Sequence, residues 1–201
     1  MKKIILSFLL FCLLFSVIAP IASAKTLSYW YSDSNRIGNA PNRYIWSVNY
    51  DGFTASEFST YLSHGRNQWS NAGISNWGAD NKSSSGIWVF GGTRETLEVL
   101  EPGLVGFSAL AVVYHEANGT HTYQGVTKYN RKVTKAEIYV PKQPLYYFWG
   151  AKSYRAAFTH ELGHGLGWLG HSTSSNDVMH NSGYNNDVLT SNDKNHLTQN
   201  Y

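Results

Sequence analysis

Residues 160–171 read His-Glu-Leu-Gly-His-Gly-Leu-Gly-Trp-Leu-Gly-His. On an α-helix, residues four apart share one face, so His160 and His164 can turn two imidazoles toward the same point. Glu161 lies beside them on the same helix and need not bind what the histidines bind. The spacing therefore predicts a helix that carries two metal ligands and a neighbouring carboxylate.

Gly167 follows the helical part of this stretch. Glycine adopts left-handed backbone conformations without strain, so Gly167 can end the helix and turn the chain sharply. That turn can bring His171 back to His160 and His164 as a third ligand. Three neutral imidazoles suit Zn²⁺ and leave a fourth position for water. We therefore expect one catalytic zinc ion.

Glu161 is the predicted general base. Zinc lowers the pKa of a bound water to about 7, and a nearby carboxylate can take its proton and pass it to a leaving amine. A bare His-Glu-x-x-His is only suggestive. Here Gly167 and His171 agree with it as well, which makes an accidental origin a poor explanation.

The rest of the chain predicts a single α+β domain over residues 25–201. Thr54 and Glu57 form a capping-box pattern before a helical run, and Thr190 is suited to cap the last helix. The predicted helices are residues 54–71, 153–166 and 191–200. The predicted strands are residues 44–50, 87–90, 104–114 and 136–140, with an Asn118-Gly119 turn before a possible hairpin partner at 123–129.

Residues 1–24 have the pattern of a signal peptide. Lys2 and Lys3 precede an almost wholly apolar run over 4–18, and Ala22-Ser23-Ala24 supplies small residues before a cut. A retained membrane anchor is the alternative, although the run is short for a span of about 20 residues. The favoured interpretation is a secreted protein with no stable membrane association after signal cleavage.

Charge and cysteine content narrow the range of partners. The formal net charge of +3 falls by two when Lys2 and Lys3 leave with the signal, and no run of basic residues stands out. Nucleic acid is therefore not an expected partner. The single cysteine, Cys12, lies in the predicted signal, so the mature domain is expected to fold without disulfides. We expect a monomer that acts on protein or peptide substrates.

The long histidine pattern resembles the metzincin clan of zinc endopeptidases. That clan has a methionine turn beneath the metal, for which Met179 is the candidate, with an ordinary core residue as the alternative. The match is closest to matrixins, because Ser172 follows His171 and residues 189–201 resemble the end of a matrixin catalytic domain. The resemblance is specific over residues 153–201 and general over 44–150.

By this resemblance, a twisted five-stranded mixed sheet packs on the active-site helix and a second long helix, with a short C-terminal helix. Substrate would lie extended along an edge strand within residues 104–114. Residues 180–189 would wall the pocket beside the cut bond, with Tyr184 as its ring. Some metzincins place a metal-binding tyrosine two residues after the methionine, but Asn181 stands there, so that role does not transfer.

Two matrixin features find little support in the sequence. Matrixins stay latent through a prosegment cysteine, which the mature chain lacks, so we expect activity once zinc is bound or restraint by another protein. Matrixins also hold structural zinc and calcium. His115 and His121 could hold a second zinc, but a solvated loop is the better interpretation there. Ca²⁺ is possible, but no acidic cluster indicates it.

Two other functions remain open. The same metal chemistry could hydrolyse another amide, for example in a cell-wall polymer, because the motif does not fix the acyl donor. The aromatic-rich chain could alternatively be a non-catalytic binding module, although a site that only holds zinc has no need of Glu161. The favoured function is a secreted zinc metalloendopeptidase that hydrolyses internal peptide bonds.

Overall fold

The computed structural model describes residues 37–123, 126–143, 150–181, 184–198 and 201. The predicted signal peptide over 1–24 lies outside these residues, so it stays a prediction. Within the described part of the chain, no helix combines the length and the apolar composition that a membrane span requires.

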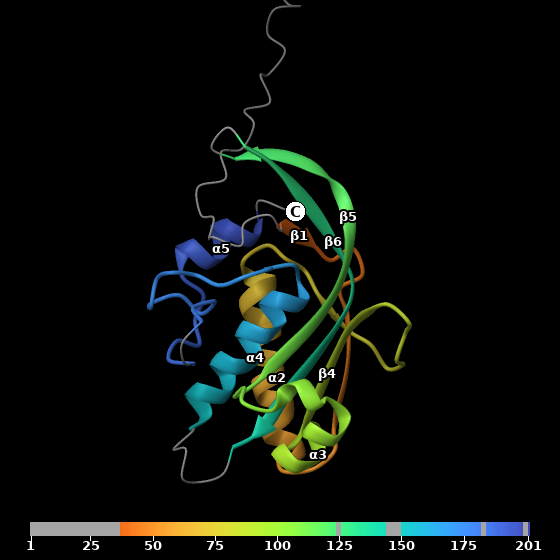
Figure 1. Cartoon of the computed structure of the whole chain (residues 1–201). Coiled ribbons are helices and arrows are strands. Elements are labelled where there is room, and N and C mark those ends of the chain that lie inside the picture. Colours follow the sequence, from red (N-terminus) through yellow and green to blue (C-terminus); the bar gives the residue numbers. More distant parts are fainter. Residues whose placement is uncertain (1–36, 124–125, 144–149, 182–183, 199–200) are drawn as a thin grey trace, which may run out of the picture.

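The described structure contains a mixed sheet of six strands, which lies to one side of the two long helices (Figure 1). The strand order is β1-β6-β4-β2-β3, and these strands run parallel to one another. Strand β5 pairs antiparallel with β6 and forms the outer edge. The strands are β1 (Ile37–Asn39), β2 (Tyr44–Asn49), β3 (Trp77–Gly78), β4 (Gly86–Thr93), β5 (Leu110–Tyr123) and β6 (Val126–Lys142).

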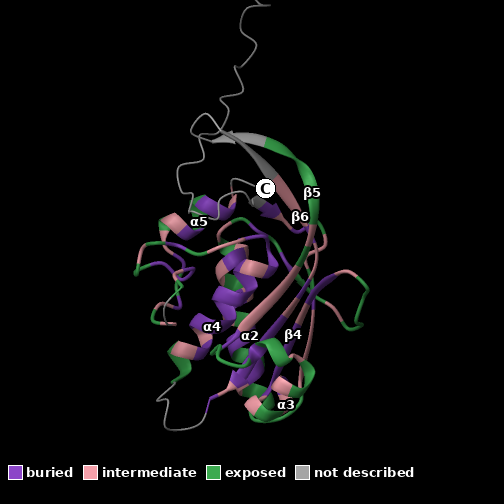
Figure 2. Cartoon of the chain, in the orientation of Figure 1, coloured by how far each residue is buried: buried purple, intermediate pink, exposed green. Residues whose placement is uncertain are grey.

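Strand β4 shows how the sheet separates two layers. Its side chains alternate between faces. Ile87 and Val89 join the main core under the helices, whereas Phe90 joins a second cluster on the other face. That second cluster is closed by Leu97 of helix α3 (Arg94–Leu100) and by Leu104 of a 3₁₀ turn (Pro102–Leu104). Both faces of this strand are therefore covered, as Figure 2 shows by its buried colour.

Helices α2 (Ala55–Asn71) and α4 (Ala151–Gly165) pack against each other over the main core. Trp69 of α2 is fully buried, and its indole N–H donates to the carbonyl of Thr159 on α4 at 2.8 Å. Gly65 lets α2 approach Leu162 and Phe158 closely. Burial of these rings and of Leu162 removes a large apolar area from water and fixes α4 in place.

The expected α+β fold is confirmed, with differences in detail. The predicted cap of α2 is present: the Thr54 side chain accepts from Glu57 N, and the Glu57 side chain accepts from Thr54 N. The C-terminal helix α5 (Ser191–Thr198) also follows Thr190 as predicted, with residues 199–200 outside the described part. The described sheet has six strands where five were expected. The short strands β1 and β3 were not predicted because they carry no apolar alternation, whereas the predicted strands over 123–129 and 136–140 lie largely within one continuous strand, β6.

The predicted strand over residues 104–114 was wrong at its start. Pro102 begins a 3₁₀ turn, and strand β5 begins only at Leu110. Helix α3 was missed in the sequence. The two glycines after Phe90 do not stop β4, because it continues through them to Thr93, and the ring of Phe58 fills the space beside Gly91.

The predicted hairpin turn at Asn118-Gly119 was also wrong. Strand β5 runs through both residues, and one residue more lies between Ala117 and Thr120 than on the partner strand. Gly119 has a φ of 77°, which suits a bulge. The positive φ that predicts a turn therefore produces a bulge, and the strand continues to Tyr123.

Candidate active site

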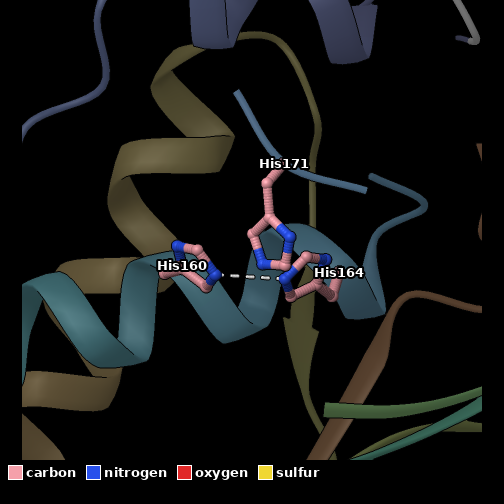
Figure 3. A group of neighbouring side chains, drawn as sticks. All are labelled: His160, His164 and His171. Atoms are coloured by element: carbon pink, nitrogen blue, oxygen red, sulfur yellow. Dashed lines mark hydrogen bonds between the residues drawn. The ribbon is translucent and has the colours of Figure 1, made fainter. Parts of the chain in front are cut away.

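His160 and His164 lie one turn apart on helix α4 and point their rings toward each other (Figure 3). Their Nε2 atoms are 3.1 Å apart, and the ring planes are nearly perpendicular at 77°. His160 is buried and His164 is half-buried, facing the cleft described below. The helical spacing in the sequence thus places the two rings as predicted.

The outer nitrogens of both rings bind backbone carbonyls. His160 Nδ1 donates to the carbonyl of Val178 at 2.7 Å, and His164 Nδ1 donates to that of Trp168 at 2.7 Å. A neutral imidazole that donates through Nδ1 has a lone pair on Nε2. The lone pairs of the two Nε2 atoms therefore face each other at short range and repel. A cation between them would relieve this repulsion.

His171 completes the group from a segment beyond the helix. The ligand atoms of His160, His164 and His171 all lie within 4.8 Å of one another. Nitrogens bound to one tetrahedral zinc at about 2.1 Å lie roughly 3.4 Å apart, close to the separation of the helical pair. The donor set and its spacing fit a metal ion of this kind. It is the one such group found among the described residues.

Gly167 makes the turn that returns His171. Its φ is 111°, in the left-handed region that favours glycine. A side chain there would also collide with the carbonyl of Gly38 on β1. After the turn, Trp168 N donates to Gly163 O at 2.9 Å, which satisfies one of the last carbonyls of the helix. Backbone conformation and close packing both require glycine at position 167.

Met179 lies beneath the helix between the two helical ligands. Its side chain is fully buried in the main core. The preceding segment is fixed by Asp193 of α5, whose carboxylate accepts from Val178 N at 2.9 Å and from Met179 N at 3.2 Å. The carbonyl of Val178 is the one that receives His160 Nδ1, so this turn orients a predicted ligand.

Glu161 is buried next to His160, with a side chain that lines the cleft. Burial raises the pKa of its carboxyl to about 7, and a hydrogen bond from Tyr184 opposes this rise. The Tyr184 hydroxyl donates to Glu161 Oε1 at 2.8 Å. Burial also lowers the pKa of His164 to about 4 and that of His160 well below 6.5. Both rings are therefore neutral in the folded protein at neutral pH.

A cleft of about 680 Å³ opens beside these residues. The first residues of β5 and the segment before it form one wall, and helix α4 forms the other. All three histidines, Glu161 and Tyr184 line it. The predicted edge strand therefore borders the cleft, although it starts later in the sequence than expected.

Several cleft residues had no role in the sequence-based prediction. Ser153 lies on α4 upstream of the histidines and lines the cleft. The predicted solvated loop at His115 is wrong, because His115 is a half-buried residue of β5 that lines the cleft. The side chain of His121 lies outside the described residues, so a second zinc stays untested. The cleft residues without a predicted role are Ser153, Trp168, Leu169 and Gly170. Residues 106–111 and Val113 lie within the predicted edge segment, and His180 and Asn185 lie within the predicted pocket wall.

Comparisons with known proteins give little support beyond the structure itself. No protein-family model matches the chain, and no curated protein gives a significant match. Among solved structures, the chain is similar to High choriolytic enzyme 1 (HCE-1), a hatching enzyme zinc-protease from Oryzias latipes (Medaka fish). The identity is 10%, the match covers 85% of this chain and 96% of that chain, and the TM-score is 0.42. So weak a likeness carries no conclusion about activity.

Proposed function

We propose that the chain is a secreted zinc metalloendopeptidase that hydrolyses internal peptide bonds. The observation that carries this proposal is the arrangement of His160, His164 and His171 beside Glu161 in one cleft. The metzincin-like motif supports the same function. Within that clan, the proposed relationship is closest to the matrixins. Export rests on the signal-like pattern of residues 1–24.

Three imidazoles would hold the zinc ion. Bound zinc would polarise a substrate carbonyl and lower the pKa of water in the remaining position. The two carbonyls that accept from His160 and His164 keep the Nε2 lone pairs directed inward. Glu161 would take a proton at its carboxylate and return it to the leaving amine.

Substrate would bind as an additional strand. Strand β5 pairs with β6 on one side and borders the cleft on the other. An extended peptide can add to such an edge through backbone hydrogen bonds, with alternate side chains entering the cleft. This arrangement suits unfolded or extended polypeptide segments within a longer chain, and therefore cleavage of internal bonds.

The test compares the full-length chain, secreted by an expression host, with Glu161→Gln and Glu95→Gln. Glu95 is exposed on α3 and does not line the cleft, so it controls for the loss of one carboxylate. We expect about one zinc per chain in all three proteins. Cleavage of a quenched random-peptide library should fall by several orders of magnitude in Glu161→Gln alone.

Other outcomes separate the alternatives. Zinc in wild type without peptide cleavage, together with release of products from cell-wall material, would favour the amide of a wall polymer. No zinc in a well-folded wild type would overturn the proposal. Sequencing the N-terminus of the secreted product would test the cut before Lys25.

A further inference from the structure

Tyr184 touches both the predicted general base and a predicted metal ligand. Its hydroxyl donates to Glu161 Oε1 at 2.8 Å. Its ring meets that of His160 edge to face, with centroids 5.4 Å apart and planes at 88°. The side chain therefore reaches across the cleft from the segment after Met179 to helix α4.

The same hydroxyl also reaches the opposite wall. The backbone N–H of Ala109, just before β5, hydrogen-bonds to it. A tyrosine hydroxyl has one proton, so it can accept from Ala109 while it donates that proton to Glu161. The hydroxyl is thus held from the wall of the cleft and is aimed at one carboxylate oxygen.

That wall is itself braced by side chains. Arg94 Nη2 donates to the carbonyl of Phe107 at 3.0 Å, and Gln143 Nε2 donates to that of Ser108 at 2.7 Å. Three successive residues before β5 therefore have a backbone group bound by a side chain. Ala109, to which the Tyr184 hydroxyl is bound, is therefore held in place from behind the cleft. A rigid Ala109 N–H fixes the position of the hydroxyl.

Glu161 needs such a restraint more than the histidines do. A glutamate carboxylate rotates broadly about its last bond, and groups that act in proton transfer need to be held within about 0.5 Å of the productive position. A hydrogen bond to Oε1 fixes the plane of the carboxylate. It leaves Oε2 as the oxygen that can receive a proton from the cleft.

We propose that Tyr184 is the positioning residue of Glu161, holding its carboxylate by a hydrogen bond braced against Ala109. This inference rests on the proposed peptidase function. It differs from a role as pocket wall, because a wall acts through the ring and on substrate binding. The positioning role acts through the hydroxyl and on the rate of the chemical step.

Tyr184→Phe removes the hydroxyl and keeps the ring. With a zinc-loaded enzyme, we expect kcat to fall about 10- to 100-fold, the range typical of outer hydrogen-bond partners around a metal site. KM should change less than about threefold. Tyr50→Phe is the matched control, because Tyr50 follows β2 with 50% of its surface exposed and does not line the cleft. It should leave both constants unchanged. An unchanged kcat in Tyr184→Phe, or a change in KM alone, would overturn the positioning role.

A second readout does not depend on activity. Crystal structures of zinc-loaded wild type and Tyr184→Phe should show Glu161 Oε1 within hydrogen-bonding distance of the Tyr184 hydroxyl in the first. In the second, the carboxylate should be rotated or spread over several conformers, with the three histidines unmoved. A Glu161 side chain that is identical and equally ordered in both would overturn the inference. An inactive, zinc-loaded wild type would refute the peptidase function, and the two structures would still decide the role of Tyr184.

Discussion

The side chain of Met179 occupies the space that Gly163 leaves open on helix α4. A Cβ at Gly163 would lie 2.5 Å from Met179 Sδ and 2.7 Å from Trp69 Cζ2. Gly163 lies between the two helical ligands. Met179 and Trp69 therefore pack against the helix at the turn that carries the metal-binding histidines. The glycine of the histidine motif is therefore explained by close packing.

Gly163→Ala should destabilise the protein despite the higher helix propensity of alanine. The propensity gain is about 1 kcal/mol, whereas forcing a methyl group into a packed core typically costs about 1–3 kcal/mol. We expect a lower urea midpoint for unfolding of the metal-free protein. Gly150→Ala, at the N-cap of the same helix, meets nothing within 4 Å and serves as the control. Stabilisation by Gly163→Ala would contradict this prediction and would show that Met179 and Trp69 can move aside at little cost.

Asp193→Asn should weaken zinc binding without touching a ligand. The Asp193 side chain is fully buried, and its two oxygens accept from Val178 N and Met179 N. An amide group cannot accept through its nitrogen, so at least one buried N–H loses its partner, at a cost of about 1–3 kcal/mol. Because Val178 O orients His160, zinc affinity should fall by about 10- to 100-fold in a chelator competition. Exposed Asp80→Asn should leave the affinity unchanged.

The metal-free protein should lose stability as the pH falls. Burial holds the pKa of His164 at about 4 and that of His160 well below 6.5. Below pH 6.5 the unfolded chain binds protons that the folded chain does not, so stability is lost as the pH falls from 6.5 toward 4. Urea unfolding of chelator-treated protein at pH 7.5, 6 and 5 measures this. A midpoint that stays constant over the range would show that the two rings take up protons in the folded state as readily as in the unfolded chain.

Asp187→Asn should loosen the segment that carries Tyr184. The Asp187 carboxylate accepts from Arg155 Nε of α4 at 2.6 Å, and its backbone carbonyl accepts from His64 Nε2 of α2 at 2.6 Å. The variant keeps the backbone contact but loses the charge pair, which is largely buried on the Asp187 side. We expect faster hydrogen exchange in residues 184–189 and a KM for peptides that rises severalfold. Glu116→Gln, which breaks the exposed pair with Lys132, should change neither quantity.

The local part of the candidate site could be read from the sequence. The positions of His160, Glu161 and His164 follow from helical periodicity, and the cap of α2 follows from Thr54 and Glu57, because these relations join residues within one turn. The glycine after the helix predicted the turn to His171 for a similar reason. Left-handed backbone at one residue is a local property that the side chain, or its absence, determines.

Tertiary structure alone decided what surrounds these residues. The sequence did not indicate that Tyr184 donates to Glu161, that Met179 lies against Gly163, or that His115 lines the cleft. Asn118-Gly119 also has the pattern of a turn, and only pairing with β6 made it a bulge. Each of these features depends on where segments far apart in the chain come together. That depends on the sum of many weak packing and hydrogen-bond energies, which no short stretch of sequence contains.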